Sequence, residues 1–167
     1  ATGARRDREL DLPGIDLNGS YGAADFVYWY DGHPDADRDW DFQPHAKQVA
    51  VLGVGNVGLD VARILAKTAE ELLVTEIPDN VHAGLQKNAT TDVHVFARRG
   101  PAQVKFTPME LRELSHSPTI DVIVHPEGFE FDHGSMEALN AAKSQKLVVK
   151  VLQDYLAREP SGADHRI

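Results

Sequence analysis

A glycine-rich turn between a predicted strand and a predicted helix constrains this chain more than any other feature. The apolar residues 49–52 lead directly into Gly53-Val54-Gly55-Asn56-Val57-Gly58, and a helical pattern follows at once. In such a turn Gly53 permits the tight bend, Gly55 lets the backbone approach a phosphate, and Gly58 allows the helix to pack close to the strand. The free N–H groups near Asn56 and Val57 suit a pyrophosphate, because the helix dipole is positive there. The turn therefore predicts dinucleotide binding, although similar turns also occur without a ligand.

The order of the remaining elements predicts a parallel sheet. Strands are expected at residues 93–97 and 120–124, and helices at 109–114 and from about 135 to 158. Alternating strands and helices form parallel sheets with right-handed crossovers. The sequence therefore predicts a doubly wound, three-layer Rossmann-like α/β fold. The buried face of the helix after the turn is expected to contain Val57, Val61, Ile64 and Leu65.

The chain is expected to form one domain with a leading segment and a core. Residues 1–46 are predicted to be that segment and a charged loop, with the aromatic run 23–30 as a short helix or strand. Residues 47–167 are predicted to be the core, and residues 163–167 resemble the start of a strand at which the domain is cut. The weakly helical stretch 69–90 is broken at Pro78, and residues 69–91 are interpreted as an insertion in the first crossover.

Two arginines at the end of the second strand indicate which dinucleotide would bind. NAD-binding domains carry an acidic residue there, about 20 positions after the glycines, which binds the ribose hydroxyls. This chain has Arg98 and Arg99, and Arg98 follows Gly53 by 98 − 53 = 45 positions, which is why an insertion is expected. Guanidinium groups would bind a 2′-phosphate that a carboxylate would repel. The pair predicts NADP, and its alternative is a solvated strand end.

Composition excludes several other classes of function. The 167 residues include no cysteine, which excludes disulfides, thiol nucleophiles and thiolate metal sites. The eight histidines show no metal-ligand spacing, and the net charge of −9 argues against nucleic-acid binding. No apolar run is long enough to span a membrane, and no signal peptide is visible, so a cytoplasmic location is expected, with the mitochondrial matrix open. No general base or nucleophile stands out, so no catalytic residue is assigned.

Several long strings give the chain a family resemblance. The chain resembles the NADP domain of the adrenodoxin-reductase-like ferredoxin–NADP reductases. The resemblance is carried by GVGNVGLDVARIL and ARRGPAQVKFTPMELREL, by ATGA at residues 1–4, and by a matching stretch at 13–35. The resemblance is strong to about Leu114 and weaker beyond Thr119. Family members more often have alanine where this chain has Gly58, a change that is conservative for close packing.

The resemblance implies a flavin-dependent reaction and a set of cofactor-binding residues. NADPH would give a hydride to FAD, held by a second domain that this chain lacks, and electrons would pass to ferredoxin. The residues implied for NADP are Gly53, Gly55, Asn56, Val57, Gly58, Arg98, Arg99 and Glu110. Glu110 would lie near the adenosine ribose, although a solvated glutamate at a helix start is an equal reading. The chain is therefore expected to be a fragment that binds NADP(H) without turnover.

The last predicted helix carries a possible docking surface. Its expected apolar face contains Leu147, Val148, Val151, Leu152, Tyr155 and Leu156, and Lys143, Lys146 and Lys150 lie opposite. The family docks acidic ferredoxins on basic residues of this domain, so these lysines are candidates, while a plain solvated face is the alternative. Three other functions stay open: the NADP domain of a glutamate-synthase small-subunit-like flavoprotein, a stand-alone nucleotide sensor, and a domain that has lost its ligand.

Overall fold

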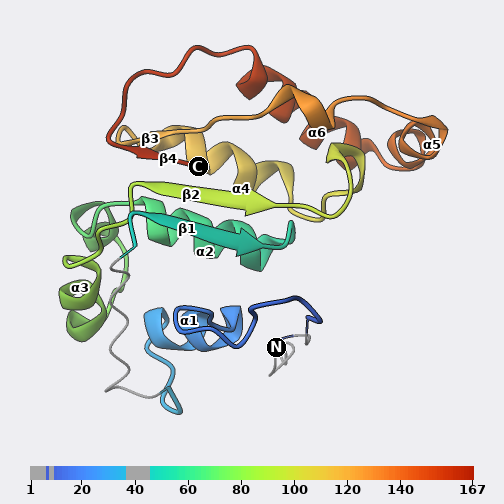
Figure 1. Cartoon of the computed structure of the whole chain (residues 1–167). Helices are drawn as coiled ribbons and strands as arrows, with labels where there is room; N and C mark the ends of the chain where they lie inside the picture. Colours follow the sequence, from blue (N-terminus) through green and yellow to red (C-terminus); the bar gives the residue numbers. More distant parts are fainter. Residues whose placement is uncertain (1–6, 8–9, 37–45) are drawn as a thin grey trace. The chain divides into compact units, whose positions relative to one another are not determined.

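The computed structural model describes residues 7, 10–36 and 46–167 (Figure 1). The chain divides into two compact units, one formed by residues up to 45 with 68–89 and the other by 46–67 with 90–167. The predicted insertion thus belongs to the same unit as the N-terminal segment. The ATGA stretch and much of the charged loop lie outside the described residues.

The larger unit contains a parallel four-stranded sheet in the order β1-β2-β4-β3. Its strands are β1 (Gln48–Leu52), β2 (Asp92–Phe96), β3 (Ile120–Asp121) and β4 (His165–Arg166). β1 and β2 pair along their whole length, with Gln48 opposite Asp92 and Leu52 opposite Phe96. The two strands therefore end at the same edge of the sheet, and the predicted Rossmann-like fold is confirmed.

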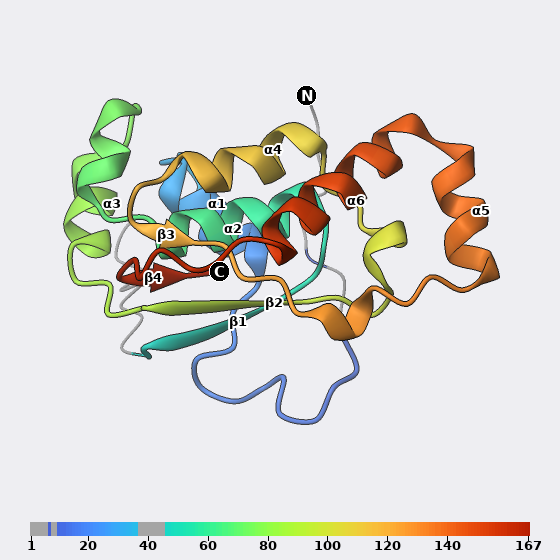
Figure 2. The same cartoon turned by 90° about the horizontal axis from the view of Figure 1, so that it is seen from above.

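Three helices cover one face of this sheet: α2 (Asn56–Ala66), α4 (Pro108–Glu113) and α6 (Lys143–Leu156) (Figure 2). One hydrophobic core cluster of this unit consists of Leu59, Val104, Phe106, Leu111, Leu114, Val148, Val151 and Tyr155. The Tyr155 hydroxyl, although buried, is satisfied because it donates a hydrogen bond of 2.6 Å to the Leu111 carbonyl. This contact joins α6 to α4.

Three predictions about single elements are wrong in detail. Val57, expected on the buried face of α2, is 55% exposed because it lies in the first turn, at the open end of the helix. Leu147 is also exposed on α6. The last helix is two helices, α5 (His133–Ala141) and α6, because Ala142 between them is extended with φ −143° and ψ 125°.

The third strand is shorter than predicted and pairs with the end of the chain. β3 has two residues instead of the predicted five because its partner β4 is equally short. β4 inserts between β2 and β3, and Ile123 extends the pairing by donating a backbone hydrogen bond of 2.7 Å to Ile167. Short 3₁₀ turns join these elements: η2 (Pro101–Gln103), η3 (Leu114–His116) and η4 (Pro126–Gly128).

The smaller unit contains α1 (Ala23–Tyr30), η1 (Glu70–Val74) and α3 (Asp79–Leu85). The aromatic run forms a helix, and Phe26 and Trp29 are buried with stacked rings 5.9 Å apart. Pro78 stands immediately before α3, so the predicted break in this stretch is confirmed. Among the described residues, no helix has the length and apolar character needed to cross a membrane.

Candidate functional site

The glycine turn connects the end of β1 to the start of α2. Gly53 has φ +142°, a conformation that L side chains rarely adopt, so glycine is required at this bend. Its N–H donates a hydrogen bond of 3.1 Å to the carbonyl of Phe96, the last residue of β2. The turn is therefore fixed against the end of the neighbouring strand.

The other two glycines occupy very different surroundings. Gly55 is the N-cap of α2, has no capping side chain, and has open space where a Cβ would lie. A Cβ on Gly58 would lie 2.6 Å from the Gly53 carbonyl oxygen. An alanine at position 58 is therefore not a conservative change here, because the turn itself would have to shift. The open N-terminus of α2 and the cleared space at Gly55 fit an anionic group.

Asn56 contributes its side chain to the scaffold. Its Oδ1 accepts a hydrogen bond of 2.9 Å from the backbone N–H of Thr107, the N-cap of α4. A second bond of 2.7 Å joins the Lys105 N–H to the Val54 carbonyl. These two bonds hold the start of α4 beside the start of α2.

The same bond from Thr107 changes the environment of Glu110. Thr107 and Glu110 have the spacing of a capping box, in which the glutamate side chain bonds back to the N–H of the capping residue. The Thr107 hydroxyl does accept from the Glu110 N–H, at 3.5 Å, but the Thr107 N–H is taken by Asn56. The Glu110 carboxylate is left with a buried oxygen, Oε2, that has no hydrogen-bond partner among the residues the structure describes. Such an oxygen is costly unless a ligand satisfies it, which favours a binding role for Glu110 over a solvated one.

Arg98 and Arg99 follow β2 at the edge where the glycine turn lies. Both are exposed, and neither forms an ion pair with another residue that the structure describes. The pairing of Leu52 with Phe96 and the bond from Gly53 to Phe96 bring the two segments together. The site is therefore assembled from two motifs 45 positions apart (98 − 53) in the sequence.

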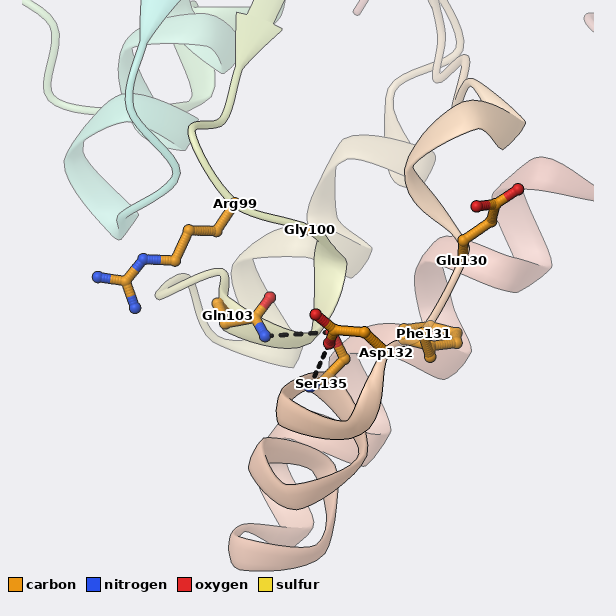
Figure 3. A pocket seen from close by; sticks show the side chains of 7 residues that line it. All are labelled: Arg99, Gly100, Gln103, Glu130, Phe131, Asp132 and Ser135. Carbon is orange, nitrogen blue, oxygen red and sulfur yellow. Dashed lines mark hydrogen bonds between the residues drawn. The ribbon is translucent and has the colours of Figure 1, made fainter.

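A pocket of about 570 Å³ extends this site beyond Arg99 (Figure 3). It is lined by Arg99, Gly100, Gln103, Glu130, Phe131, Asp132 and Ser135. Asp132 caps α5 by accepting a hydrogen bond of 2.7 Å from the Ser135 N–H. Sequence reasoning missed the pocket except for Arg99, because the segments around Gln103 and Glu130 meet only in the fold. The spacing of Asp132 and Ser135 could have predicted the cap, but not what it faces.

Comparisons with known proteins show which proteins this chain is similar to. No family model matches it. It is 40% identical over 168 aligned residues to NADPH-ferredoxin reductase FprA of Mycobacterium leprae, covering all of this chain and 36% of that protein. It is 34% identical to the mitochondrial NADPH:adrenodoxin oxidoreductase of Arabidopsis thaliana, covering 91% of this chain and 32% of that protein. The chain is homologous to a segment of these ferredoxin–NADP reductases.

The fold comparison agrees with the sequence comparison. The structure of Mycobacterium tuberculosis FprA in complex with NADPH matches with a TM-score of 0.86 and 38% identity, over 99% of this chain and 36% of that one. The predicted resemblance to the adrenodoxin-reductase-like group is thus confirmed. The chain spans about a third of the length of the relatives it matches.

The charges around the site determine which chemistry it can support. The cationic groups at the sheet edge and the open end of α2 suit phosphates. The pKa of Asp132 is held below its ordinary value, chiefly by a hydrogen bond from the Ser135 side chain, which favours the negatively charged carboxylate. Among the described residues no group of side chains could hold a metal ion. Lys143, Lys146 and Lys150 are all exposed along α6. Open N–H groups and exposed cationic side chains of this kind suit the binding of an anionic ligand.

Proposed function

We propose that this chain is the NADP(H)-binding domain of a flavin-dependent ferredoxin–NADP reductase. The observation that carries the proposal is the meeting of the glycine turn with Arg98 and Arg99 at one sheet edge, through the bond from Gly53 to Phe96. The similarity to a reductase solved with NADPH supports it. The glycine turn alone would suit any dinucleotide, and the two arginines favour the one with a 2′-phosphate.

Each end of the nucleotide is assigned to different groups. The N–H groups of Asn56 and Val57 bind the pyrophosphate, which approaches across the open space at Gly55. Gly53 permits the bend at φ +142°, and Gly58 leaves room for the Gly53 carbonyl oxygen, so both glycines belong to the cofactor-binding turn. Arg98 and Arg99 bind the 2′-phosphate. The unpartnered oxygen of Glu110 accepts a hydrogen bond from a ribose hydroxyl.

This domain positions the nucleotide and performs no bond chemistry of its own. When bound, NADPH supplies a hydride, for which FAD held by the rest of the polypeptide is the acceptor, and the electrons then go to ferredoxin. The residues of this chain hold the phosphates and the ribose, so that the nicotinamide end is presented in one orientation. We expect this chain to bind NADP(H) and to show no ferricyanide turnover without added flavin domain.

Retention on immobilised 2′,5′-ADP tests the assignment. The 167-residue chain should be retained, and the double variant Arg98→Ala with Arg99→Ala should pass through, because both contacts to the 2′-phosphate are lost. The matched control is Arg112→Ala with Arg158→Ala, which removes the same charge from exposed positions elsewhere. Equal retention of all three proteins would contradict the proposal.

We further propose that Lys143, Lys146 and Lys150 form part of the ferredoxin dock. Their exposure on α6, without an ion-pair partner among the described residues, supports long-range attraction of an acidic protein. Reversal of all three to glutamate should weaken ferredoxin binding to this chain at low salt by about tenfold or more. Reversal of the exposed Lys47, Lys87 and Lys105 is the control. Equal losses in the two variants would show that only net charge matters and would remove the assignment.

A further inference from the structure

The segment between η2 and α4 runs beside the glycine turn. The Lys105 N–H donates a hydrogen bond of 2.7 Å to the Val54 carbonyl, and two residues later the Thr107 N–H donates one of 2.9 Å to Asn56 Oδ1. The two segments therefore advance together, with Lys105 opposite Val54 and Thr107 opposite Asn56. A side chain on this segment that points away from the core is close to the turn.

The alternation of buried and exposed residues determines the direction of the Lys105 side chain. Val104 and Phe106 are 5% and 8% exposed, and both belong to the hydrophobic cluster that contains Leu59 of α2 and Leu111 of α4. Val104 is extended, with φ −62° and ψ 154°, and successive side chains of an extended segment point to opposite sides. Lys105 is exposed, and it forms no ion pair with a residue that the structure describes. Its ammonium group therefore lies on the solvent side of the turn.

The charges near the turn favour a role for this lysine in binding the diphosphate of a dinucleotide. That group is doubly anionic, whereas the start of a helix offers about half a unit of positive charge. The chain has a net charge of −9, and Glu110 adds a carboxylate in the first turn of α4. Arg98 and Arg99 are assigned to the 2′-phosphate. Residues 53–57 and 104–110, all within the described part of the chain, contain one cationic side chain, that of Lys105.

We propose that Lys105 binds the diphosphate of NADP(H) together with the backbone N–H groups at the start of α2. The inference rests on the proposed NADP function and adds a side-chain cation to a part of the site otherwise assigned to backbone groups. A lysine ammonium is a compact charge on a flexible four-carbon stem, so it binds a phosphate without requiring one fixed geometry. The bond to Val54 fixes where this stem begins, and because it is a backbone bond, substitution of the side chain leaves it in place.

The test uses three ligands that differ in their phosphates, titrated by calorimetry into the 167-residue chain. Adenosine 2′-monophosphate carries only the 2′-phosphate, 2′,5′-ADP adds the 5′-phosphate with which the diphosphate begins, and NADPH carries the whole diphosphate. Lys105→Ala should lower the affinity for 2′,5′-ADP and for NADPH by about tenfold, because a charge-assisted contact is lost. The affinity for adenosine 2′-monophosphate should change by about twofold or less, since that ligand has no phosphate for Lys105 to contact.

The matched control is Lys47→Ala. Lys47 is an exposed lysine that precedes β1, whereas the turn follows β1, so the two positions lie at opposite edges of the sheet. This variant loses the same charge and should bind all three ligands within about twofold of the wild-type chain. Lys105→Gln, which keeps much of the stem without the charge, should lose as much affinity for 2′,5′-ADP as Lys105→Ala, and Lys105→Arg should retain most of it. Equal losses in Lys47→Ala and Lys105→Ala would show that only net charge matters.

The outcomes separate this inference from the proposed function. If Lys105→Ala binds 2′,5′-ADP as the wild-type chain does, or loses affinity for all three ligands alike, Lys105 does not bind the diphosphate, while the NADP function stands. If the wild-type chain binds none of the three ligands, the NADP function fails and this inference fails with it. Circular dichroism of each variant verifies that a loss of binding does not come from unfolding. Ferredoxin binding is measured without nucleotide, so the reversal of Lys105 in its control variant does not affect that comparison.

Discussion

At the scale of single residues, Asn56 keeps the Glu110 carboxylate from bonding to the Thr107 N–H. By accepting from the Thr107 N–H at 2.9 Å, Asn56 takes the bond that Glu110 would make in a capping box. Asn56 thus joins the starts of two helices, and the acceptor Glu110 Oε2 has no partner within the described part of the chain. Sequence alone shows the spacing of Thr107 and Glu110, but not the competitor 51 positions away.

Substitution of Glu110 by glutamine tests this reading. A neutral acceptor gives a weaker hydrogen bond than a charged one, by about 1 kcal/mol, so NADPH affinity should fall about fivefold. The melting temperature without nucleotide should stay the same or rise, because an unpaired carboxylate oxygen is no longer buried. Glu159→Gln, at an exposed position, serves as the control for lost charge. Unchanged affinity, or a clear loss of stability, would show that the carboxylate has a structural partner instead.

The residues that could be predicted from sequence share one property: their roles follow from local pattern. Gly53 is identified by its place between a strand and a helix, and its φ of +142° agrees with that role. Arg98 and Arg99 are identified by their place after the second strand. Gln103 and Ser135 meet across 32 positions, and no local pattern in either segment signals their contact.

At the scale of elements, the C-terminal strand depends on Asp121. This residue of β3 accepts hydrogen bonds of 2.8 to 2.9 Å from the backbone N–H groups of Ser161, Gly162 and Ala163 and from the Ser161 hydroxyl. These bonds fix the loop that leads into β4, which lies in the middle of the sheet. The bond from the Ser161 N–H is the main cause that holds the pKa of Asp121 below its ordinary value of 3.8.

Asp121→Asn should therefore destabilise the chain in a pH-dependent manner. An amide has one acceptor oxygen in place of two, and we expect a loss of about 1 kcal/mol at pH 7, kept small because the site is near solvent. A carboxyl whose pKa is lowered on folding stabilises the fold above its unfolded pKa, and this contribution is lost as the pH falls through the folded value. The difference between wild type and variant should thus stay constant down to about pH 4 and shrink below it.

Urea unfolding at pH 7 and pH 3 measures this difference. Asp154→Asn, on the exposed side of α6, gives the effect of a lost charge without the four bonds. A difference that stays constant or grows at pH 3 would mean that Asp121 is not held as a carboxylate by the loop.

Sequence patterns predict some element boundaries in this chain and fail to predict others. The strand predicted at residues 93–97 forms at Asp92–Phe96 and pairs along its full length with β1. The break between α5 and α6 falls at Ala142. Because alanine has high helix propensity, the local sequence does not predict a break there. β3 is limited to two residues by a partner that comes from the last residues of the chain. The length of β3 is thus set by this long-range pairing, although the residue types of the segment favour a longer strand.

At the scale of the whole molecule, the family assignment and the site geometry support each other. The homology covers the full chain, and the two motifs that define the cofactor meet at one edge of the sheet. The fold class follows from the alternation of strands and helices. The division into two units does not, because residues 68–89 look like a local insertion in sequence yet belong with the N-terminal segment.

A calorimetric comparison of NADPH and NADH binding to this chain tests most directly whether Arg98 and Arg99 select the 2′-phosphate. Two charge-assisted contacts to the 2′-phosphate predict a preference for NADPH of about 100-fold. In the Arg98→Ala, Arg99→Ala variant the affinity for NADPH should fall to that for NADH, and the affinity for NADH should change by about twofold or less. Equal affinity of the wild-type chain for the two nucleotides, or a preference that survives in the variant, would show that Arg98 and Arg99 do not select NADPH.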